Sequence, residues 1–262
     1  MEINHFYING NFVDPIGQEK IDLIDPATEE KVGHVVTGVE QDVDAAVSAA
    51  KSAFNEASLL TLEQKKVILQ EIIDGMQARK EEFAQVISEE MGAPIKVARS
   101  AQFGSGLVHF INTLKVIDNF SFSEVHDNIT INKLPIGPVG MITPWNWPLN
   151  QMCTKVASAI AAGTTFVLKP SEITPGAAHL FAEVVHETSM PKGMFNLIHG
   201  HGAVVGKAMS KHADLEMISF TGSTRAGIDI QKTAAYNIKR VSLELGGKSP
   251  NLILDDVDLE KA

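Results

Sequence analysis

The sequence predicts an α/β fold in which a doubly wound parallel sheet follows a helical region and a projecting β-hairpin. Three observations support this prediction. Short apolar runs alternate with helical segments from Pro138 onward, helical periodicity dominates the part before residue 119, and strand-like alternation fills the stretch between them. Repeated strand and helix segments favour parallel strands covered by helices on both faces. Ligands of such sheets bind beyond the carboxyl ends of the strands.

The first part of the chain begins with a predicted hairpin. In "FYINGNFVD" two β-prone runs surround Asn9-Gly10, a dipeptide favoured in type I′ turns. A turn at Asp25-Pro26 and another short strand come next. Helical periodicity then predicts one helix around 43–54, a second that continues from about Leu69 to a stop at Gly92, and a third over 97–118.

The remaining elements are predicted from the hydrophobic pattern after residue 118. Residues 119–137 alternate as strands do, with a turn expected at 126–128. Strands are then expected in "VGMIT", "TTFVL", "MFNLI", "EMISF" and "RVSLEL", and helices at 149–162, 175–188, 202–210 and 225–235. We therefore divide the chain into a helical part (1–118), a hairpin (119–137), a Rossmann-like core (138–248) and the start of a further domain (249–262).

Composition excludes several classes of function. The chain has 262 residues, 44% of them hydrophobic, and a net charge of −10. Nucleic-acid binding needs a clustered basic face, and we expect none here. No stretch has the length of a membrane span, and the start lacks the apolar core of a signal peptide. A single cysteine permits no disulfide framework, which indicates the cytoplasm.

That single cysteine, Cys153, has two interpretations. It is either a catalytic thiol or a small apolar side chain on the buried face of a helix. Leu149, Met152, Val156 and Ile160 form an apolar stripe at helical spacing, and Cys153 lies within it. A reactive cysteine needs partial exposure and a neighbour that stabilises the thiolate. The spacing favours packing.

Chemistry is expected where the predicted strands end. The residues there are "PWN" (144–146), "KPSE" (169–172), "HGHG" (199–202), "TGST" (221–224) and "LELGGK" (243–248). Each has an ordinary structural explanation, such as a solvated strand end, a helix-dipole charge or a turn residue. Because parallel strands bring their carboxyl ends to one edge, the five segments together predict a binding site.

Two of these segments indicate a nucleotide. In "TGSTRAG", Gly222 and Gly227 flank a turn into a helix whose free N–H groups suit an anion. Lys169 adds a cation, and Glu172 is a carboxylate that can bind the two hydroxyls of a ribose. Because Glu172 would repel a 2′-phosphate, NAD is favoured over NADP.

Glu244 is the candidate base. In "RVSLELGGK" it alternates with Leu243 and Leu245 and therefore points to the opposite face of its strand. A carboxylate in a partly desolvated cleft has a raised pKa and can act as a general base, whereas a solvated acid on an edge strand would have no such role. His199 and His201 come without a recognisable set of further ligands, so we expect no metal site.

These motifs resemble those of the NAD(P)-dependent aldehyde dehydrogenases. "PWNWP" (144–148), "KPSE", "FTGST" (220–224) and above all "LELGGKSP" (243–250) occur in the order and at separations similar to those of the family. "IDPATEE" and the helical first half agree with it as well, so the resemblance spans essentially the whole chain. Trp147 stands where the family commonly carries Phe, which is a conservative difference.

The resemblance implies a reaction in which a cysteine thiolate attacks an aldehyde, hydride passes to the nicotinamide, and water hydrolyses the thioester. Asn146 matches the oxyanion donor, Glu244 the base and Lys155 a lysine associated with proton relay. The hairpin at 119–137 matches the oligomerisation arm of a homodimer or homotetramer. The resemblance assigns these residues to the cofactor: Ile142, Thr143, Pro144, Trp145, Lys169, Ser171, Glu172, Gly202, Gly222, Ser223, Thr224, Gly227, Leu245 and Gly246.

The family nucleophile lies beyond "LELGGKSP", whereas Cys153 matches a scaffold position. We therefore expect the chain to be the cofactor-binding half of an aldehyde dehydrogenase and inactive alone. Two alternatives stay open: a non-catalytic module for NAD binding or oligomerisation, and a CoA-acylating relative, against which Glu244 argues because such enzymes usually lack this base. We expect the helix at 97–118 and Trp147 to line part of an aldehyde tunnel.

Overall fold

A seven-stranded sheet forms the centre of the protein, in the order β12-β11-β8-β9-β10-β2-β3. The structure is a computed structural model, and it describes residues 1–260. The strands of this sheet are β2 (Phe6–Ile8), β3 (Asn11–Val13), β8 (Val139–Ile142), β9 (Phe166–Lys169), β10 (Phe195–Leu197), β11 (Met217–Gly222) and β12 (Arg240–Leu245).

The predicted doubly wound parallel sheet is confirmed. Strands β12, β11, β8, β9 and β10 run parallel, and the register places Ile142 beside both Lys169 and Phe220. The next residue pair along the same edge is Phe220 and Leu243. The carboxyl ends of these strands therefore meet at one edge, as the βαβ alternation requires.

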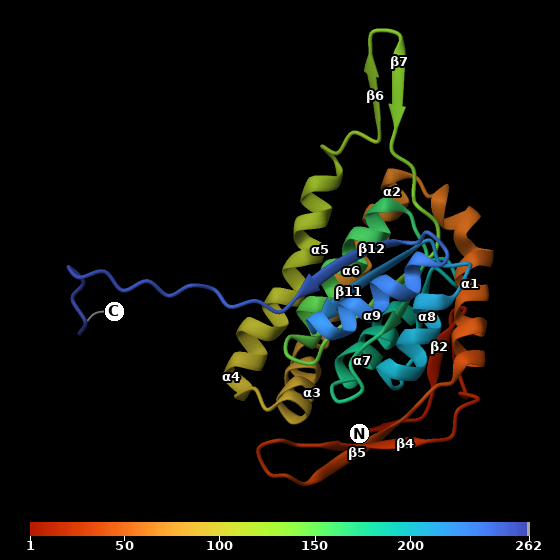
Figure 1. Cartoon of the computed structure of the whole chain (residues 1–262). Coiled ribbons are helices and arrows are strands. Elements are labelled where there is room, and N and C mark those ends of the chain that lie inside the picture. Colours follow the sequence, from red (N-terminus) through yellow and green to blue (C-terminus); the bar gives the residue numbers. More distant parts are fainter. Residues whose placement is uncertain (261–262) are drawn as a thin grey trace.

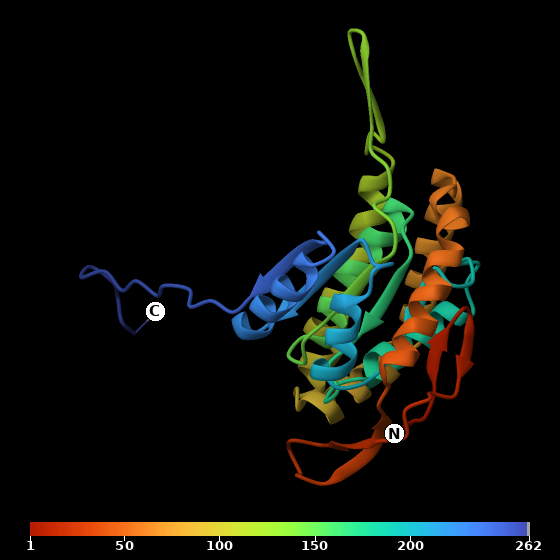
Figure 2. The ribbon, with the colours of Figure 1, turned by 45° about the vertical axis from the view of Figure 1, so that its right-hand side comes forward.

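Helices cover both faces of the sheet (Figures 1 and 2). Neighbouring residues of one strand point to opposite faces, so Met141 packs in one core cluster and Ile142 in the other. The first face carries α2 (Leu62–Ala78), α3 (Lys80–Met91), α5 (Phe103–Ile117), α6 (Pro148–Ala162) and α7 (Gly176–His186). The second carries α1 (Glu40–Ser58), α8 (Lys207–Lys211) and α9 (Thr224–Ala235).

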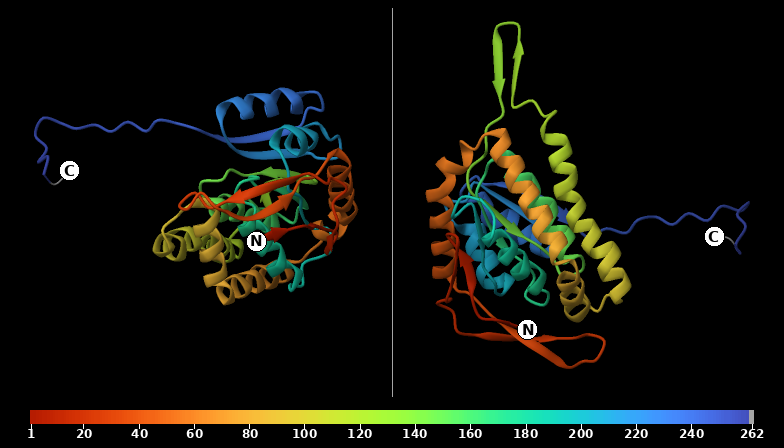
Figure 3. Two further views of the ribbon diagram at one scale, coloured as in Figure 1. Left: turned by 90° about the horizontal axis from the view of Figure 1, so that it is seen from below. Right: turned by 180° about the vertical axis from the view of Figure 1, so that it is seen from behind.

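The N-terminal hairpin extends the central sheet, which the sequence pattern did not predict. Asn9 and Gly10 have φ of 53° and 76°, as a type I′ turn requires. Strand β2 pairs antiparallel with β10 through Tyr7 and Leu197. A separate three-stranded sheet joins β1 (Glu2–Ile3), β5 (Lys31–Val36) and β4 (Lys20–Ile24), and the view from below in Figure 3 shows it crossing the base of the molecule. Residues 1–118 are therefore helical only from Glu40 onward.

The expected single helix from Leu69 to Gly92 is wrong, because the chain forms two helices there. Helix α2 ends at Ala78 and α3 begins at Lys80, so Arg79 is the boundary residue of both, with φ −108° and ψ 19°. The Arg79 guanidinium binds Glu82 on α3 and Glu183 on α7, each at 2.7 Å, which holds this bend. Gly92 ends α3 in the left-handed conformation, as predicted.

The expected helix at 97–118 is present with an irregular start. A short helix α4 (Ile95–Val97) and a π-helical segment η1 (Ala98–Gln102) lead into α5. Similarly, the expected helix at 202–210 comprises a π-helical segment η2 (Gly202–Gly206) followed by α8. Single π-helical turns are frequent near functional sites.

Two segments leave the body of the molecule. Strands β6 (Ser123–His126) and β7 (Ile129–Asn132) form the predicted hairpin, which projects at the top of Figure 1 with Val125 and Ile129 exposed. Residues 246–260 follow β12 as an extended, exposed segment (Figure 1). The predicted boundary at 249–262 falls partly outside the described residues. In residues 1–260 no helix is both long and apolar enough to span a bilayer.

Candidate active site

A cleft of about 930 Å³ opens at the carboxyl edge of the parallel strands. All five strand-end segments contribute to its walls. Four of them contribute several residues each, within 144–146, 169–172, 221–223 and 244–246, and "HGHG" contributes Gly202 alone. The residues that line it are Ile142, Thr143, Pro144, Trp145, Asn146, Asn150, Gln151, Thr154, Lys169, Ser171, Glu172, Gly202, Phe220, Thr221, Gly222, Ser223, Glu244, Leu245 and Gly246.

The cleft brings together all the predicted site residues except three. Lys155 lies on α6 and donates to the Ser219 hydroxyl of β11 at 2.8 Å instead of lining the cleft. Thr224 is the exposed first residue of α9. Gly227 was assigned to a pyrophosphate site, but a Cβ there would approach Leu245 Cδ2 to 2.7 Å. The close packing of α9 on β12 therefore accounts for this glycine.

Lys169 and Glu172 form an ion pair at one end of the cleft. The Lys169 side chain is 2% exposed, and its Nζ donates to Glu172 Oε2 at 2.9 Å and to the Pro170 carbonyl at 2.8 Å. Burial lowers the pKa of Lys169, and the Glu172 carboxylate opposes this effect. Burial raises the pKa of Glu172, but the Lys169 charge and hydrogen bonds outweigh it, so this pKa is lower than usual. Glu172 is therefore held as a carboxylate.

The N-terminus of α9 forms the next part of the wall. Ser223 is the N-cap, and its hydroxyl accepts from the Ala226 N–H at 3.2 Å. A Cβ at Gly222 would approach the Phe220 ring to 2.5 Å, so a larger residue does not fit there. Gly202 and Gly246 have open space beside them. A helix N-terminus with bare backbone beside it offers free N–H groups to an anion.

Asn146 and Glu244 reach the cleft from different elements. Asn146 lies in the loop between β8 and α6, and its backbone carbonyl accepts from Gln102 Nε2 at 3.4 Å. Glu244 lies beside Thr221 on β12, which is the edge strand of the sheet. Glu244 is exposed, so the expected partial desolvation of its carboxylate is wrong for these residues. The reason is that no segment in residues 1–260 packs over this end of the edge strand.

Lys155 is close enough to Glu244 for their charges to interact. Burial lowers the pKa of Lys155 to about 8, although the Glu244 charge acts in the opposite direction. Lys155 and Ser219 lie on α6 and β11, whereas Glu244 lies on β12. Lys155 is thus a half-buried basic group of α6, bound to Ser219 of β11, whose pKa lies well below that of an ordinary lysine.

The two histidines are not arranged as metal ligands. His199 is fully buried and neither ring nitrogen has a hydrogen-bond partner, and burial lowers its pKa well below the usual value. The His201 ring lies 3.4 Å from Glu19 and 3.9 Å from Glu172. Within residues 1–260 no group of three or more His, Cys, Asp or Glu side chains is placed to hold a metal ion.

Asn150, Gln151 and Thr154 are cleft residues that the sequence reasoning missed, whereas Phe220 and Thr221 lie in the recognised "FTGST" segment but were given no individual role. A signal for the first three was available. The apolar stripe of α6 faces the core, which leaves polar residues of the same helix for its other face.

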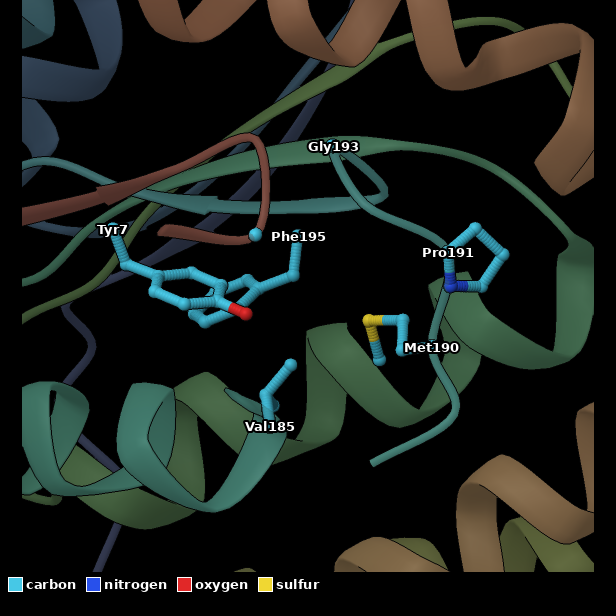
Figure 4. Close-up of a pocket in the computed structure, with 7 residues that line it drawn as sticks. Tyr7, Val185, Met190, Pro191, Gly193 and Phe195 are labelled. Atoms are coloured by element: carbon cyan, nitrogen blue, oxygen red, sulfur yellow. The ribbon is translucent and has the colours of Figure 1, made fainter. Parts of the chain in front are cut away.

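A second hollow is much smaller. Figure 4 shows Tyr7, Val185, Met190, Pro191 and Phe195 around a space of about 10 Å³, which holds at most one water molecule. It lies where the N-terminal hairpin meets the end of α7, and none of the predicted site residues lines it. The cleft is therefore the candidate site.

Comparisons with known proteins identify the family of this chain. The model of the aldehyde dehydrogenase family matches residues 12–262. The chain belongs to the aldehyde dehydrogenase family. The family resemblance inferred from "PWNWP", "KPSE", "FTGST" and "LELGGKSP" is thereby confirmed.

Individual aldehyde dehydrogenases resemble the chain over its whole length. It is 45% identical to 3-succinoylsemialdehyde-pyridine dehydrogenase of a Pseudomonas species, covering all of this chain and 55% of that protein. An aldehyde dehydrogenase structure from Bartonella henselae shares 46% identity with a TM-score of 0.96, covering 99% of this chain and 56% of that one. Aldehyde dehydrogenase C of Pseudomonas syringae, a cysteine-to-alanine variant with NAD⁺ and octanal, shares 46% identity with a TM-score of 0.97.

The chain matches only part of the length of each of these relatives. The match to the Pseudomonas syringae structure covers 99% of this chain but 53% of that chain. Betaine aldehyde dehydrogenase of Staphylococcus aureus in complex with NAD⁺ is 35% identical, with a TM-score of 0.93, 98% of this chain covered and 52% of that one. The chain thus spans about half the length of the relatives it matches. These complexes support a nicotinamide cofactor for the family fold seen here.

Cys153 does not serve as the thiol of an aldehyde dehydrogenase in this structure. Its side chain is 0% exposed and lies on the buried face of α6. This face packs against α5, where a Cβ at Gly106 would lie 3.4 Å from the sulfur. Burial raises the pKa of Cys153 well above the usual value, so the thiol stays protonated. The prediction that this cysteine is a packing residue is confirmed.

We expect Cys153 to be inert toward thiol reagents in the folded chain. Absorbance with 5,5′-dithiobis(2-nitrobenzoic acid) at pH 8 should show no thiolate released over minutes under native conditions. One equivalent should be released after unfolding in guanidinium chloride, because the side chain then becomes accessible. Rapid reaction of one equivalent in the native chain would contradict the burial of this thiol.

Proposed function

We propose that the protein to which this chain belongs oxidises an aldehyde to a carboxylic acid with NAD. These residues would supply the cofactor site, the oxyanion donor Asn146 and the base Glu244. One observation supports the proposal most strongly: residues assigned to three separate roles, from strands far apart in the sequence, line a single cleft. Membership of the aldehyde dehydrogenase family supports the same chemistry.

Each residue has a defined task in this reaction. Glu172 accepts hydrogen bonds from the ribose hydroxyls while Lys169 keeps it ionised. The N-terminus of α9 binds the phosphates. NAD held by these residues would supply the hydride acceptor. The Asn146 amide donates to the aldehyde oxygen as negative charge develops on it, and Glu244 takes a proton from the attacking water.

The nucleophile of the reaction is not among these 262 residues in our proposal. Their single cysteine is buried in the core and protonated. Lys155 has a pKa of about 8, and we assign its neutral form, which is populated above that pH, to receive the proton that Glu244 takes up. The exposure of Glu244 is consistent with a role at a boundary where further protein completes the site.

NAD is the cofactor we propose, in preference to NADP. Glu172 is ionised and lies at the end of the cleft where the ribose fits, so it would repel a 2′-phosphate. Solved relatives in complex with NAD⁺ support a nicotinamide cofactor.

Further parts of the proposal concern the whole protein. The exposed apolar side chains of the β6–β7 hairpin suit a homodimer or homotetramer, with 119–137 as its arm and 138–248 as the cofactor core. The net charge of −10 and the single cysteine suit the cytoplasm. The names of the relatives include a succinoylsemialdehyde-pyridine dehydrogenase and a complex with octanal, so their substrates are aldehydes of differing polarity.

The test is calorimetric titration of the 262-residue chain with NAD and with NADP, beside an assay for NADH formation with propanal. We expect NAD to bind at least tenfold more tightly than NADP, without NADH formation. Equal affinity would overturn the cofactor assignment, and absence of binding would overturn the cofactor site. NADH formation would show that the nucleophile lies within the chain. A longer protein that includes the nucleophile but still forms no NADH would favour the alternative of a non-catalytic module that only binds NAD.

A further inference from the structure

One wall of the cleft is built from three polar side chains of α6. Asn150 lies one helical turn beyond Asn146, and Gln151 and Thr154 follow on the same helix. The residues proposed for the cofactor come from β8, β9 and the loops after them, from Gly202, from the start of α9 and from the end of β12, and none of them lies on α6. The α6 wall, which follows the proposed oxyanion donor along the chain, therefore remains for the other reactant.

Asn150 is oriented by a residue of the neighbouring helix. His109 on α5 has its Nε2 3.0 Å from Asn150 Oδ1. Because an amide oxygen only accepts, His109 Nε2 carries the proton and donates it. The NH₂ group of Asn150 is then turned away from His109, and in residues 1–260 it donates to no protein group.

Gln151 and Thr154 also keep their side-chain hydrogen-bonding capacity. Within the described chain, Gln151 uses its backbone N–H and Thr154 its backbone carbonyl, but neither side chain has a partner. All three residues are half-buried. An apolar group laid over this wall would remove water from an amide or hydroxyl without replacing its hydrogen bond, which is unfavourable.

The α6 wall carries no charge. Among the residues that line the cleft, the ionisable side chains are Lys169, Glu172 and Glu244, which come from β9, the loop after it, and β12. Lys155, the next charged residue of α6, is directed to Ser219 on β11. A charged substrate group would therefore find no opposite charge on the α6 wall, whereas a neutral polar group finds three partners.

We propose that Asn150, Gln151 and Thr154 bind the part of the substrate that lies beyond its aldehyde group. The preferred substrates are then uncharged aldehydes that carry a hydroxyl, carbonyl, amide or heteroaromatic nitrogen, in preference to plain alkyl or aryl aldehydes. His109 acts as a positioning residue that presents the Asn150 amide. This inference rests on the proposed aldehyde site and adds its substrate class.

The test compares two aldehydes of nearly equal size and shape, 4-(hydroxymethyl)benzaldehyde and 4-ethylbenzaldehyde. Each is titrated into the ¹⁵N-labelled 262-residue chain with and without saturating NAD, and the affinity is read from the resonances of Asn150, Gln151 and Thr154. We expect the hydroxymethyl compound to bind 3- to 10-fold more tightly. The loss of a hydrogen bond at a partly exposed site has about this effect.

Variants then assign the preference to the wall. The double substitution Asn150→Leu with Thr154→Val should abolish or reverse the ratio of the two affinities. Ser158→Ala, on an exposed position of the same helix, should leave the ratio unchanged. His109→Phe should reduce the ratio without abolishing it, because Asn150 loses its orienting partner.

The outcomes separate this inference from the proposed function. Equal or tighter binding of 4-ethylbenzaldehyde to the unaltered chain would overturn the substrate class even if NAD binds as proposed. Binding of neither aldehyde at these resonances would overturn the assignment of the wall. NAD binding is scored independently, so its absence would count against the proposed function alone. Because the unaltered chain decides the first point, a variant that fails to fold does not rescue the inference.

Discussion

Replacing Lys169 by Met is expected to weaken NAD binding by at least tenfold and to lower the free energy of unfolding by about 1–3 kcal/mol. The Lys169 ammonium is 2% exposed and is the cation that pairs with Glu172 at 2.9 Å. Without it the Glu172 carboxylate loses its charge partner, its pKa rises, and it becomes a poorer acceptor for the ribose. Calorimetry with NAD and urea unfolding would measure both effects.

A matched substitution is available on the surface. Lys51 and Asp214 form an ion pair at 2.6 Å, with 60% and 41% of these side chains exposed. Lys51→Met should cost less than about 1 kcal/mol, because exposed pairs are screened by water, and should leave NAD affinity unchanged. Equal behaviour of the two variants in NAD titrations would show that Lys169 has no part in cofactor binding.

Glu90→Gln is expected to remove a loss of stability that the unaltered chain shows as the pH rises. Glu90 is 6% exposed, and both carboxyl oxygens accept from the Gly176 N–H at the start of α7 at 2.9 Å. Burial raises the pKa of Glu90 from 4.5 to about 8, although the hydrogen bonds from α7 oppose it. The folded chain therefore keeps a proton that the unfolded chain releases.

The sign of the pH effect follows from this proton. Where the folded state binds more protons than the unfolded state, stability falls as the pH rises. The fall should run from about pH 4.5 to about pH 8 and amount to at most about 5 kcal/mol. Urea unfolding at closely spaced pH values would measure it. Above pH 8 the Gln variant should exceed the unaltered chain in stability.

Glu89→Gln is the control for this experiment. Glu89 is exposed, and its charge contributes to raising the pKa of Glu90. This variant should keep the fall in stability and move it slightly toward lower pH. A Glu90→Gln variant with the same pH dependence as the unaltered chain would mean that another group binds the proton.

Much of the fold could be predicted because its signals are local. The alternation of "VGMIT", "TTFVL", "MFNLI" and "EMISF" with helical segments predicted the parallel sheet and its binding edge. Asn9-Gly10 predicted a type I′ hairpin, and the apolar stripe of 149–160 predicted that Cys153 is buried. Each of these depends on residues a few positions apart, where chain geometry alone determines which side chains share a face.

Other features depend on contacts between residues far apart in the sequence. Arg79 ends one helix and begins the next because its guanidinium binds Glu183, which is more than a hundred positions away. Gly227 belongs to a recognised motif, yet Leu245 determines the space beside it. The desolvation of Glu244 depends on whether another segment packs over its edge strand. The motif around Glu244 does not contain that information.

The sequence by itself therefore determined the family, the order of the elements and the side chains that gather at one edge of the sheet. Only the tertiary structure decided that His109 orients Asn150, that Lys155 donates to Ser219, and that Glu90 binds the start of α7. These pairs are separated by 41, 64 and 86 positions. The pKa values of Lys155 and Glu90 and the orientation of Asn150 depend on burial and distance, which arise when the helices pack on the sheet.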